Sequence, residues 1–192
     1  MTSHPLSTQI EIENIVATSA IEQELDVAQL GADLSGGTYD AEQFPGVICR
    51  LPMTSATMLL YRTGTITCTG ANSIQDVEQG YQELFTQLRT LGVSVPDEPS
   101  ISIENLVSSA DLETSLDLNT LAIGLRIEEI EYEPEQFPGL VYRLEELSIV
   151  VLIFNSGKLI ITGSKTEAKT HTAVERVKSR LSELGFLAES RR

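Results

Sequence analysis

Side chains that could act as acids, bases, nucleophiles or metal ligands are sparse in this sequence and lie far apart. The chain has two histidines, His4 and His171, and two cysteines, Cys49 and Cys68. No two of them have the short spacing of a metal-binding motif, and no nucleophile motif or glycine-rich phosphate loop occurs. Both cysteines lie in apolar stretches and are expected to be buried in strands. The sequence therefore predicts neither an enzyme nor a cofactor or metal site.

An internal repeat accounts for nearly the whole chain. Residues 10–16 (IEIENIV) resemble residues 101–107 (ISIENLV). Residues 39–51 (YDAEQFPGVICRL) share 8 of 13 positions with residues 132–144 (YEPEQFPGLVYRL). The offset is 91 residues in the first match and 93 in the second, so one loop is two residues longer in the second copy. We expect three segments: a first repeat over 9–95, a connector over 96–100 and a second repeat over 101–188.

Hydrophobic periodicity predicts the same order of elements in both copies. In the first copy it predicts strands over 10–18, 46–51, 55–62 and 65–69 and helices over 26–34 and 73–91. In the second copy it predicts strands near 101–109, 139–144, 148–155 and 158–162 and a helix near 166–184. Asp26 is expected to cap the first helix and Gly92 to end the second, with a tight hairpin at Thr63-Gly64.

The long helix of the first copy is expected to cover only one face of its sheet. Seven apolar residues fall on one side of this helix: Ile74, Val77, Tyr81, Leu84, Phe85, Leu88 and Leu91. In the second copy, residues 147–154 (LSIVVLIF) are apolar at nearly every position, which predicts apolar side chains on both faces of that strand. An uncovered apolar face usually marks a binding surface, and cover by a second molecule or by another helix is the alternative.

The charge balance is strongly acidic. The chain has 28 acidic and 13 basic residues and a net charge of −15, which by itself argues against binding to nucleic acid, since phosphate contacts need lysine and arginine. The acids are dispersed, there are only four lysines, and 41% of the residues are hydrophobic. This composition fits a folded protein of a halophilic archaeon, an ordinary acidic cytosolic protein being the alternative. No apolar stretch predicts a membrane span and the N-terminus does not resemble a secretory signal, so a cytoplasmic location is expected.

The repeated motifs resemble those of the TATA-box-binding protein family, and of a halophilic archaeal member in particular. They are the tandem E-N-[IL]-V segments, the F-P-G-[VL] turns, the [YF]-x-[TS]-G hairpins and the T-G strand ends, and the resemblance extends from residue 9 to about residue 187. The resemblance implies an α+β tandem-repeat saddle with pseudo-two-fold symmetry. In it, one curved antiparallel sheet carries helices on its convex face and binds DNA with the other face.

The resemblance also assigns roles to individual residues. Four aromatic side chains are expected to wedge between base pairs: Phe44, Tyr61, Phe137 and Phe154. Polar and apolar contacts to the minor groove are expected from Asn14, Asn105, Thr69, Thr162, Val16, Val107, Leu59, Leu152 and Ile160. Phosphate contacts are expected from Arg50, Arg143, Lys158 and Lys165, with Arg62 as a substitute contact in the first repeat. Each of these basic side chains has the alternative of being only a solvated surface charge.

The family's partners follow from the same resemblance. Double-stranded promoter DNA with a TATA box is the expected ligand, and Glu133 and Glu135 match the acidic loop that binds transcription factor B, which recruits RNA polymerase. Homodimerisation through the apolar face in the absence of DNA is a further possibility. No catalytic activity, cofactor, metal or membrane contact is implied.

The first repeat departs from the family pattern more than the second. Thr65 and Asn72 stand where the second repeat has Lys158 and Lys165, and Tyr61 replaces the usual phenylalanine. The first 100 residues carry a net charge of −10 and the remainder −5. We therefore expect the second repeat to hold DNA more firmly. A divergent regulatory paralogue that acts mainly through protein partners is the alternative function.

Overall fold

The computed structural model describes residues 8–187, so that His4 lies outside the described residues. The chain divides into two compact units. The first unit comprises Glu13–Asn105, and the second comprises residues 8–12 together with residues 106–187. The strands β1 and β6 each pass from one unit to the other, because the divisions fall inside them.

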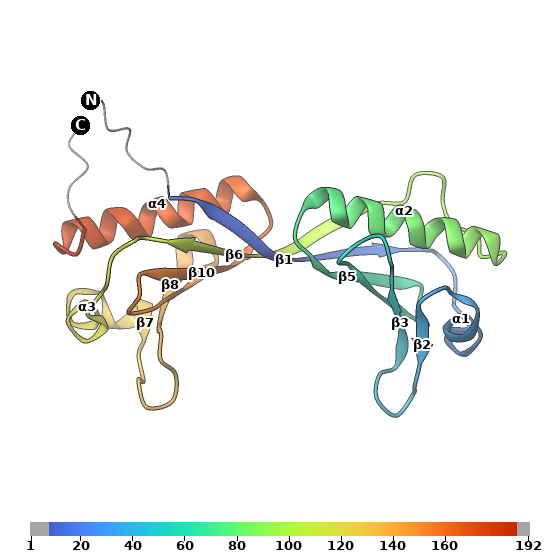
Figure 1. Ribbon diagram of the computed structural model, residues 1–192, viewed down its shortest axis with the longest axis horizontal. Coiled ribbons are helices and arrows are strands. Elements are labelled where there is room, and N and C mark those ends of the chain that lie inside the picture. The colour runs from blue at the N-terminus through green and yellow to red at the C-terminus, as the bar shows by residue number, and fades with distance from the viewer. Residues whose placement is uncertain (1–7, 188–192) are drawn as a thin grey trace. The chain divides into compact units, whose positions relative to one another are not determined.

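Within the first unit, five antiparallel strands form a sheet in the order β2-β3-β4-β5-β1. In chain order the elements are β1 (Ile10–Ala20), α1 (Val27–Asp33), β2 (Gly37–Tyr39), β3 (Gly46–Arg50), β4 (Thr57–Tyr61), β5 (Thr65–Ala71) and α2 (Ile74–Thr90). The long helix α2 lies along one side of the sheet (Figure 1) and contacts β4 and β5.

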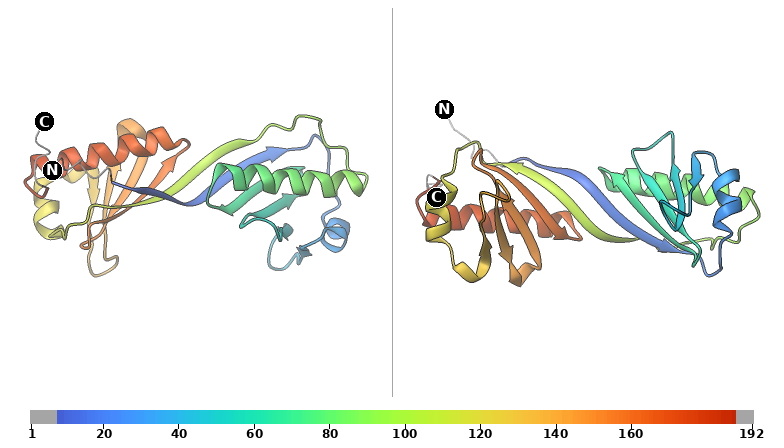
Figure 2. Two further views of the ribbon diagram at one scale, coloured as in Figure 1. Left: turned by 45° about the horizontal axis from the view of Figure 1, so that its top comes forward. Right: turned by 90° about the horizontal axis from the view of Figure 1, so that it is seen from below.

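The second unit repeats this arrangement with strand order β6-β10-β9-β8-β7. Its elements are β6 (Ser102–Asp111), α3 (Leu118–Gly124), the 3-10 turn η1 (Ile127–Glu129), β7 (Ile130–Glu131), β8 (Leu140–Leu144), the 3-10 turn η2 (Glu145–Leu147), β9 (Ile149–Ile153), β10 (Lys158–Ser164) and α4 (Glu167–Glu183). The helix α4 lies against β10 as α2 lies against β5 (Figure 2). The expected class, α+β with antiparallel strands covered by helices, is confirmed within each unit.

Strand alternation divides the side chains of the first sheet into a buried set and a half-buried set. The set under α2 is completely buried and comprises Val47, Cys49, Met58, Leu60, Ile66 and Cys68. The predicted burial of both cysteines is therefore confirmed. From α2, Tyr81 enters this core, and its hydroxyl lies 3.0 Å from the carbonyl oxygens of both Ala17 and Ile66.

The predicted helix ends are confirmed by their hydrogen bonds. The Asp26 carboxylate accepts from the backbone N–H of Gln29 at the start of α1. Gly92 has a φ of 83° after α2, where its N–H donates to the carbonyl of Arg89 and the N–H of Val93 donates to Leu88. This pattern is a Schellman motif, in which the left-handed residue is usually glycine because it has no Cβ.

Two expectations need correction. About five strands were expected in each copy, but the short strands β2 and β7 were not placed, since runs of two or three residues carry no periodicity that a sequence can reveal. Leu91 was expected on the buried face of the long helix but is 40% exposed. It is the residue that follows α2, where the Schellman motif turns the chain away from the sheet.

No helix among residues 8–187 is long and apolar enough to cross a membrane.

The hairpin between β9 and β10 generates a prediction about stability. Gly157 has a φ of 88°, and a Cβ built on it would lie 2.1 Å from the carbonyl oxygen of Thr114. Gly185 has a similar φ of 80° but no atom within 4 Å of such a Cβ. Positive φ costs a non-glycine residue about 1–3 kcal/mol, and only Gly157→Ala adds a collision with backbone. We expect Gly157→Ala to lower the free energy of unfolding by at least about 2 kcal/mol more than Gly185→Ala. Urea unfolding of the two variants in one buffer measures this, and equal losses would contradict it.

Candidate nucleic-acid interface

Each unit has a half-buried sheet face on the side opposite its long helix. In the first unit the middle row of this face runs through Ile48, Leu59 and Thr67, which are cross-strand partners on β3, β4 and β5. In the second unit the equivalent row runs through Val141, Leu152 and Ile160 on β8, β9 and β10. We call these two surfaces the open faces. Because their neighbours along each strand are fully buried under α2 or α4, the rows point away from the helices.

An aromatic pair lies at the edge of each open face. The ring centroids of Phe44 and Tyr61 are 5.4 Å apart and their planes are tilted by 59°. Those of Phe137 and Phe154 are 5.9 Å apart at 66°. The four aromatic residues expected to act together are therefore brought together as two pairs, one per unit. Phe137 is 37% exposed, although it is a large apolar side chain.

A glycine beneath each pair explains the repeated Phe-Pro-Gly motif. A Cβ on Gly139 would lie 2.8 Å from Cε1 of Phe137 and 3.1 Å from Cε1 of Phe154. A Cβ on Gly46 would lie 3.0 Å from Cε1 of Phe44. Each phenylalanine ring thus rests on a position where only glycine leaves room. The turn before it is held by a hydrogen bond from its own N–H, which Phe137 donates to the carbonyl of Glu133 at 3.0 Å.

Asn14 lies on β1 at the open face of the first unit, beside the end of β5. Its Oδ1 accepts a hydrogen bond from the N–H of Gly70 at 2.7 Å and one from the Thr69 hydroxyl at 3.5 Å. The register of β1 and β5 shifts at this point, and Gly70 has a φ of 85°. Since the amide oxygen is held within the sheet, the end of Asn14 that is oriented to reach a ligand is its NH2 donor.

The remaining residues expected at the minor groove are half-buried on alternating strand positions. They are Val16 on β1, Leu59 on β4, Thr69 on β5, Asn105 and Val107 on β6, Leu152 on β9, and Ile160 and Thr162 on β10. Four further open-face residues were missed by the sequence reasoning: Ile48, Thr67, Val141 and Val150. Alternation within each strand could have indicated these four residues. It assigns a residue to the open face only once the register of the neighbouring strands is known.

A carboxylate is hydrogen-bonded to a hydroxyl of the first unit's open face, and the sequence reasoning did not identify it. The Thr18 hydroxyl, on the same side of β1 as Asn14 and Val16, donates to Oε1 of Glu104 at 3.1 Å. This position is part-buried. A negative charge here repels a negatively charged ligand unless a cation lies between them.

The basic residues expected at phosphates, Arg50, Arg62, Arg143, Lys158 and Lys165, are all exposed. The guanidinium of Arg143 lies 2.7 Å from the Glu131 carboxylate on the neighbouring strand. The equivalent of Glu131 in the first unit is Thr38, which donates to the carbonyl of Ile48 instead. Of the two equivalent arginines, only Arg143 is held by a cross-strand acid among residues 8–187.

The acidic loop of the second unit contains Glu133 and Glu135, and both are exposed. The loop joins β7 to β8, as the loop from Asp40 to Pro45 joins β2 to β3 in the first unit (Figure 1). In the first unit, Asp40 accepts hydrogen bonds from the N–H of Glu42 and from Nε2 of Gln43. The two loops therefore share a position in the fold.

The open faces offer contact surface and hydrogen bonds. No group of three or more histidine, cysteine or acidic side chains among the described residues could hold a metal ion. Burial raises the pKa of the Cys49 and Cys68 thiols to about 11, so both remain protonated at neutral pH. His171 is exposed on α4.

Comparisons with known proteins agree with this geometry. The model of the family described as transcription factor TFIID, or TATA-binding protein, matches residues 9–91 and 100–184. A TATA-box-binding protein of Haloarcula marismortui is 52% identical over 178 residues, which cover 93% of this chain and 96% of that protein. TATA-box-binding protein B of Halobacterium salinarum is 50% identical over 182 residues, which cover 95% and 98% of the two chains.

A solved structure shows the same similarity in three dimensions. The structure described as Methanococcus jannaschii TBP matches with a TM-score of 0.82 and 39% sequence identity, over 91% of this chain and 99% of that chain. The Haloarcula and Halobacterium relatives come from halophilic archaea, as the acidic composition predicted. The family consists of DNA-binding transcription factors and not of enzymes. With half of its residues shared with these relatives and its fold shared with the methanococcal structure, the chain belongs to the TATA-box-binding protein family.

Proposed function

We propose that this protein is a general transcription initiation factor that binds the TATA box in the DNA minor groove, kinks the DNA with its aromatic pairs and recruits transcription factor B and RNA polymerase. The observation that carries the proposal is the aromatic pair at the edge of each open face. Rings held over glycine beside a half-buried apolar row fit base steps, because a ring can replace part of a base stack. Kinking by inserted side chains is established for this family.

The energetic balance of such binding rests on contact area. Unstacking a base step costs on the order of a few kcal/mol. The kinked DNA presents a widened minor groove, into which the rows through Leu59 and Leu152 fit as apolar surface. Burial of that surface releases about 25 cal/mol per Å² of apolar area, which offsets the cost of the kinks.

Preference for A·T base pairs follows from the hydrogen-bond donors on the open faces. The NH2 group of Asn14, and its equivalent on Asn105, can donate to adenine N3 or thymine O2 in the minor groove. Guanine carries an amino group in the minor groove, so at a G·C pair the NH2 donor of asparagine would face another hydrogen-bond donor. Thr69 and Thr162 supply hydroxyls next to these positions. Such a surface separates A·T from G·C but barely separates A·T from T·A.

Binding in concentrated salt is expected to differ from that of ordinary DNA-binding proteins. A protein that neutralises phosphates loses affinity as salt rises, because binding releases counterions. Here the phosphate-directed side chains are few, and the Glu104 carboxylate lies at the Thr18 hydroxyl, on the open-face side of β1. Cations taken up between carboxylates and phosphates would oppose the loss. The expected dependence of affinity on salt is shallow or inverted.

Titration of a labelled duplex tests the proposal. A TATA duplex with a fluorophore at each end should bind selectively over a G·C-substituted duplex and should show increased end-to-end energy transfer, from about 0.2 M to molar KCl. The affinity should change little or rise with salt. A steep loss of affinity with salt would contradict the cation-uptake explanation. Absence of selective binding at every salt concentration would favour a regulatory paralogue that acts through protein partners.

The charge difference between the repeats gives a second prediction. Replacing Thr65→Lys and Asn72→Lys gives the first repeat the two lysines of the second, and each added phosphate contact should steepen the slope of log affinity against log salt by about 0.9. We expect tighter binding to the TATA duplex at moderate salt. The matched control, Lys158→Thr with Lys165→Asn, should weaken binding. Unchanged affinity in both variants would rule out the proposed asymmetry between the repeats.

Recruitment of transcription factor B can be separated from DNA binding. Reversing two charges, Glu133→Lys and Glu135→Lys, should abolish the ternary complex, because it replaces the two carboxylates that the partner is expected to contact with positive charges. DNA binding alone should stay within roughly twofold, since the loop lies outside the open face. Gel-shift titration with and without transcription factor B measures both. Glu42→Lys, on the equivalent loop of the first unit, is the matched control and should leave the ternary complex intact. Loss of binary and ternary complexes together would indicate general damage and defeat the assignment.

A further inference from the structure

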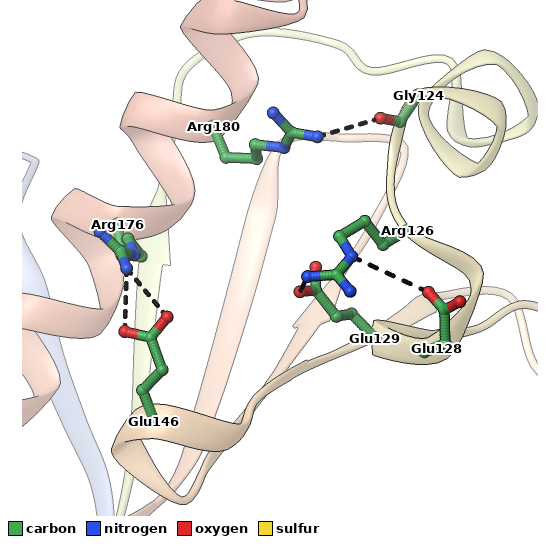
Figure 3. Close-up of polar contacts among 7 residues, drawn as sticks. All are labelled: Gly124, Arg126, Glu128, Glu129, Glu146, Arg176 and Arg180. Atoms are coloured by element: carbon green, nitrogen blue, oxygen red, sulfur yellow. Dashed lines mark hydrogen bonds and ion pairs between the residues drawn. The ribbon is translucent and has the colours of Figure 1, made fainter.

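A groove on the helix side of the second unit gathers an unusual share of the positive charge. It has a volume of about 460 Å³ and lies between α4, β8 and the two 3-10 turns η1 and η2. Four of the nine arginines in the sequence line it: Arg126, Arg143, Arg176 and Arg180. Figure 3 shows three of them, with Arg176 and Arg180 coming from α4 and Arg126 coming from the segment after α3. We call this surface the arginine groove.

The arginines of the groove are held in place by ion pairs that remain in contact with solvent. Arg176 contacts both carboxylate oxygens of Glu146, at 3.0 and 2.9 Å, and the two side chains are 58% and 77% exposed. Arg180 lies 2.9 Å from Glu183 and also donates to the carbonyl of Gly124 (Figure 3). Ion pairs this exposed add little stability and exchange readily. The guanidinium groups are therefore positioned, yet available to other carboxylates.

The first unit has a hollow at the same place, but without arginine. It is lined by Ser35, Met53, Glu83 and Gln87. By the spacing of the repeat, these are the counterparts of Arg126, Glu146, Arg176 and Arg180, respectively. The fold therefore produces the hollow in both units, whereas the positive charges of Arg126, Arg176 and Arg180 belong to the second unit alone. Packing of the helix on the sheet does not require them.

Two exposed apolar side chains flank the arginine groove. Ile123 is 86% exposed and precedes the residue whose carbonyl accepts from Arg180. Ile127 is 81% exposed and follows Arg126. Their counterparts in the first unit are Ala32 and Gly36. Exposed apolar side chains beside arginines are typical of protein–protein interfaces, where arginine is enriched and buried apolar contacts supply the affinity.

We propose that the arginine groove is a docking site for a protein segment that carries carboxylates together with apolar side chains. The carboxylates replace Glu146 and Glu183 as partners of Arg176 and Arg180, since arginine pairs with carboxylates through two parallel hydrogen bonds. The apolar side chains cover Ile123 and Ile127. The lining also includes four glutamates, Glu129, Glu145, Glu146 and Glu183, and no lysine. A nucleic acid, with a phosphate at every nucleotide, therefore fits less well than a segment whose few carboxylates replace Glu146 and Glu183.

The probe for this proposal is a set of twelve-residue peptides in which leucine, at helical spacing, is combined with aspartate and glutamate. A matched set carries asparagine and glutamine instead. The peptides are titrated into the 15N-labelled full chain, and amide shifts are followed by NMR. We expect acidic peptides to shift residues 123–127, 143–147 and 176–183, and the amide peptides to bind at least roughly tenfold more weakly.

Variants taken from the repeat itself locate the site. Arg176→Glu with Arg180→Gln installs the residues of the first unit and should weaken the acidic peptides at least roughly tenfold, while Arg89→Gln, which removes an arginine from α2, should not. TATA-duplex affinity and the melting temperature report whether the double variant remains folded and whether DNA binding is intact, so this test is independent of the proposed function. The proposal would be overturned if no acidic peptide shifted the amide signals, or if Arg89→Gln weakened peptide binding as much as the double variant does. It would also be overturned if the amide signals of the groove shifted only with a G·C duplex.

Discussion

The structure depends on the burial of one sheet face only. In each unit a single long helix covers a sheet whose strands alternate, so the residues under the helix form a core and their neighbours cannot join it. Leu59 and Leu152 therefore remain half-buried on the other side. Apolar surface left in this position is costly in water until a ligand covers it. The binding surface and the core are thus produced by the same alternation, and neither can be changed by shifting a strand without changing the other.

Much of the fold and part of the candidate site could be predicted from the sequence, because they depend on patterns that repeat. The long helices and their caps follow from periodicity, whereas the aromatic residues were identified through the resemblance of the repeated motifs to the TATA-box-binding protein family. Two features could not be predicted, since they depend on pairing between strands. The hydrogen bonds of Asn14 require the register shift between β1 and β5, and the carboxylate of Glu104 reaches Thr18 only across neighbouring strands. The short strand β2 likewise has no pattern of its own and exists because β3 pairs with it.

The two repeats keep one backbone and differ in what they place on it. Tyr81 fills the first core and shares its hydroxyl between two strand carbonyls, whereas Val174 occupies the same position under the second sheet. On the surface, Glu83 and Gln87 of α2 correspond to Arg176 and Arg180 of α4. Core differences of this kind are absorbed by local repacking. Surface differences change which molecules each unit attracts, so duplication gave one architecture two distinct outer surfaces.

The glycine under each aromatic ring has a consequence for the cost of binding. A ring that rests on Gly46 or Gly139 is restricted before any ligand arrives, because it contacts the backbone on one side and a second ring on the other. Side chains that are already ordered lose little rotamer entropy on association. The Phe-Pro-Gly motif is therefore a preorganisation device. The entropy lost in ordering these aromatic rings is lost when the protein folds, where burial of the core compensates for it, and not when DNA binds.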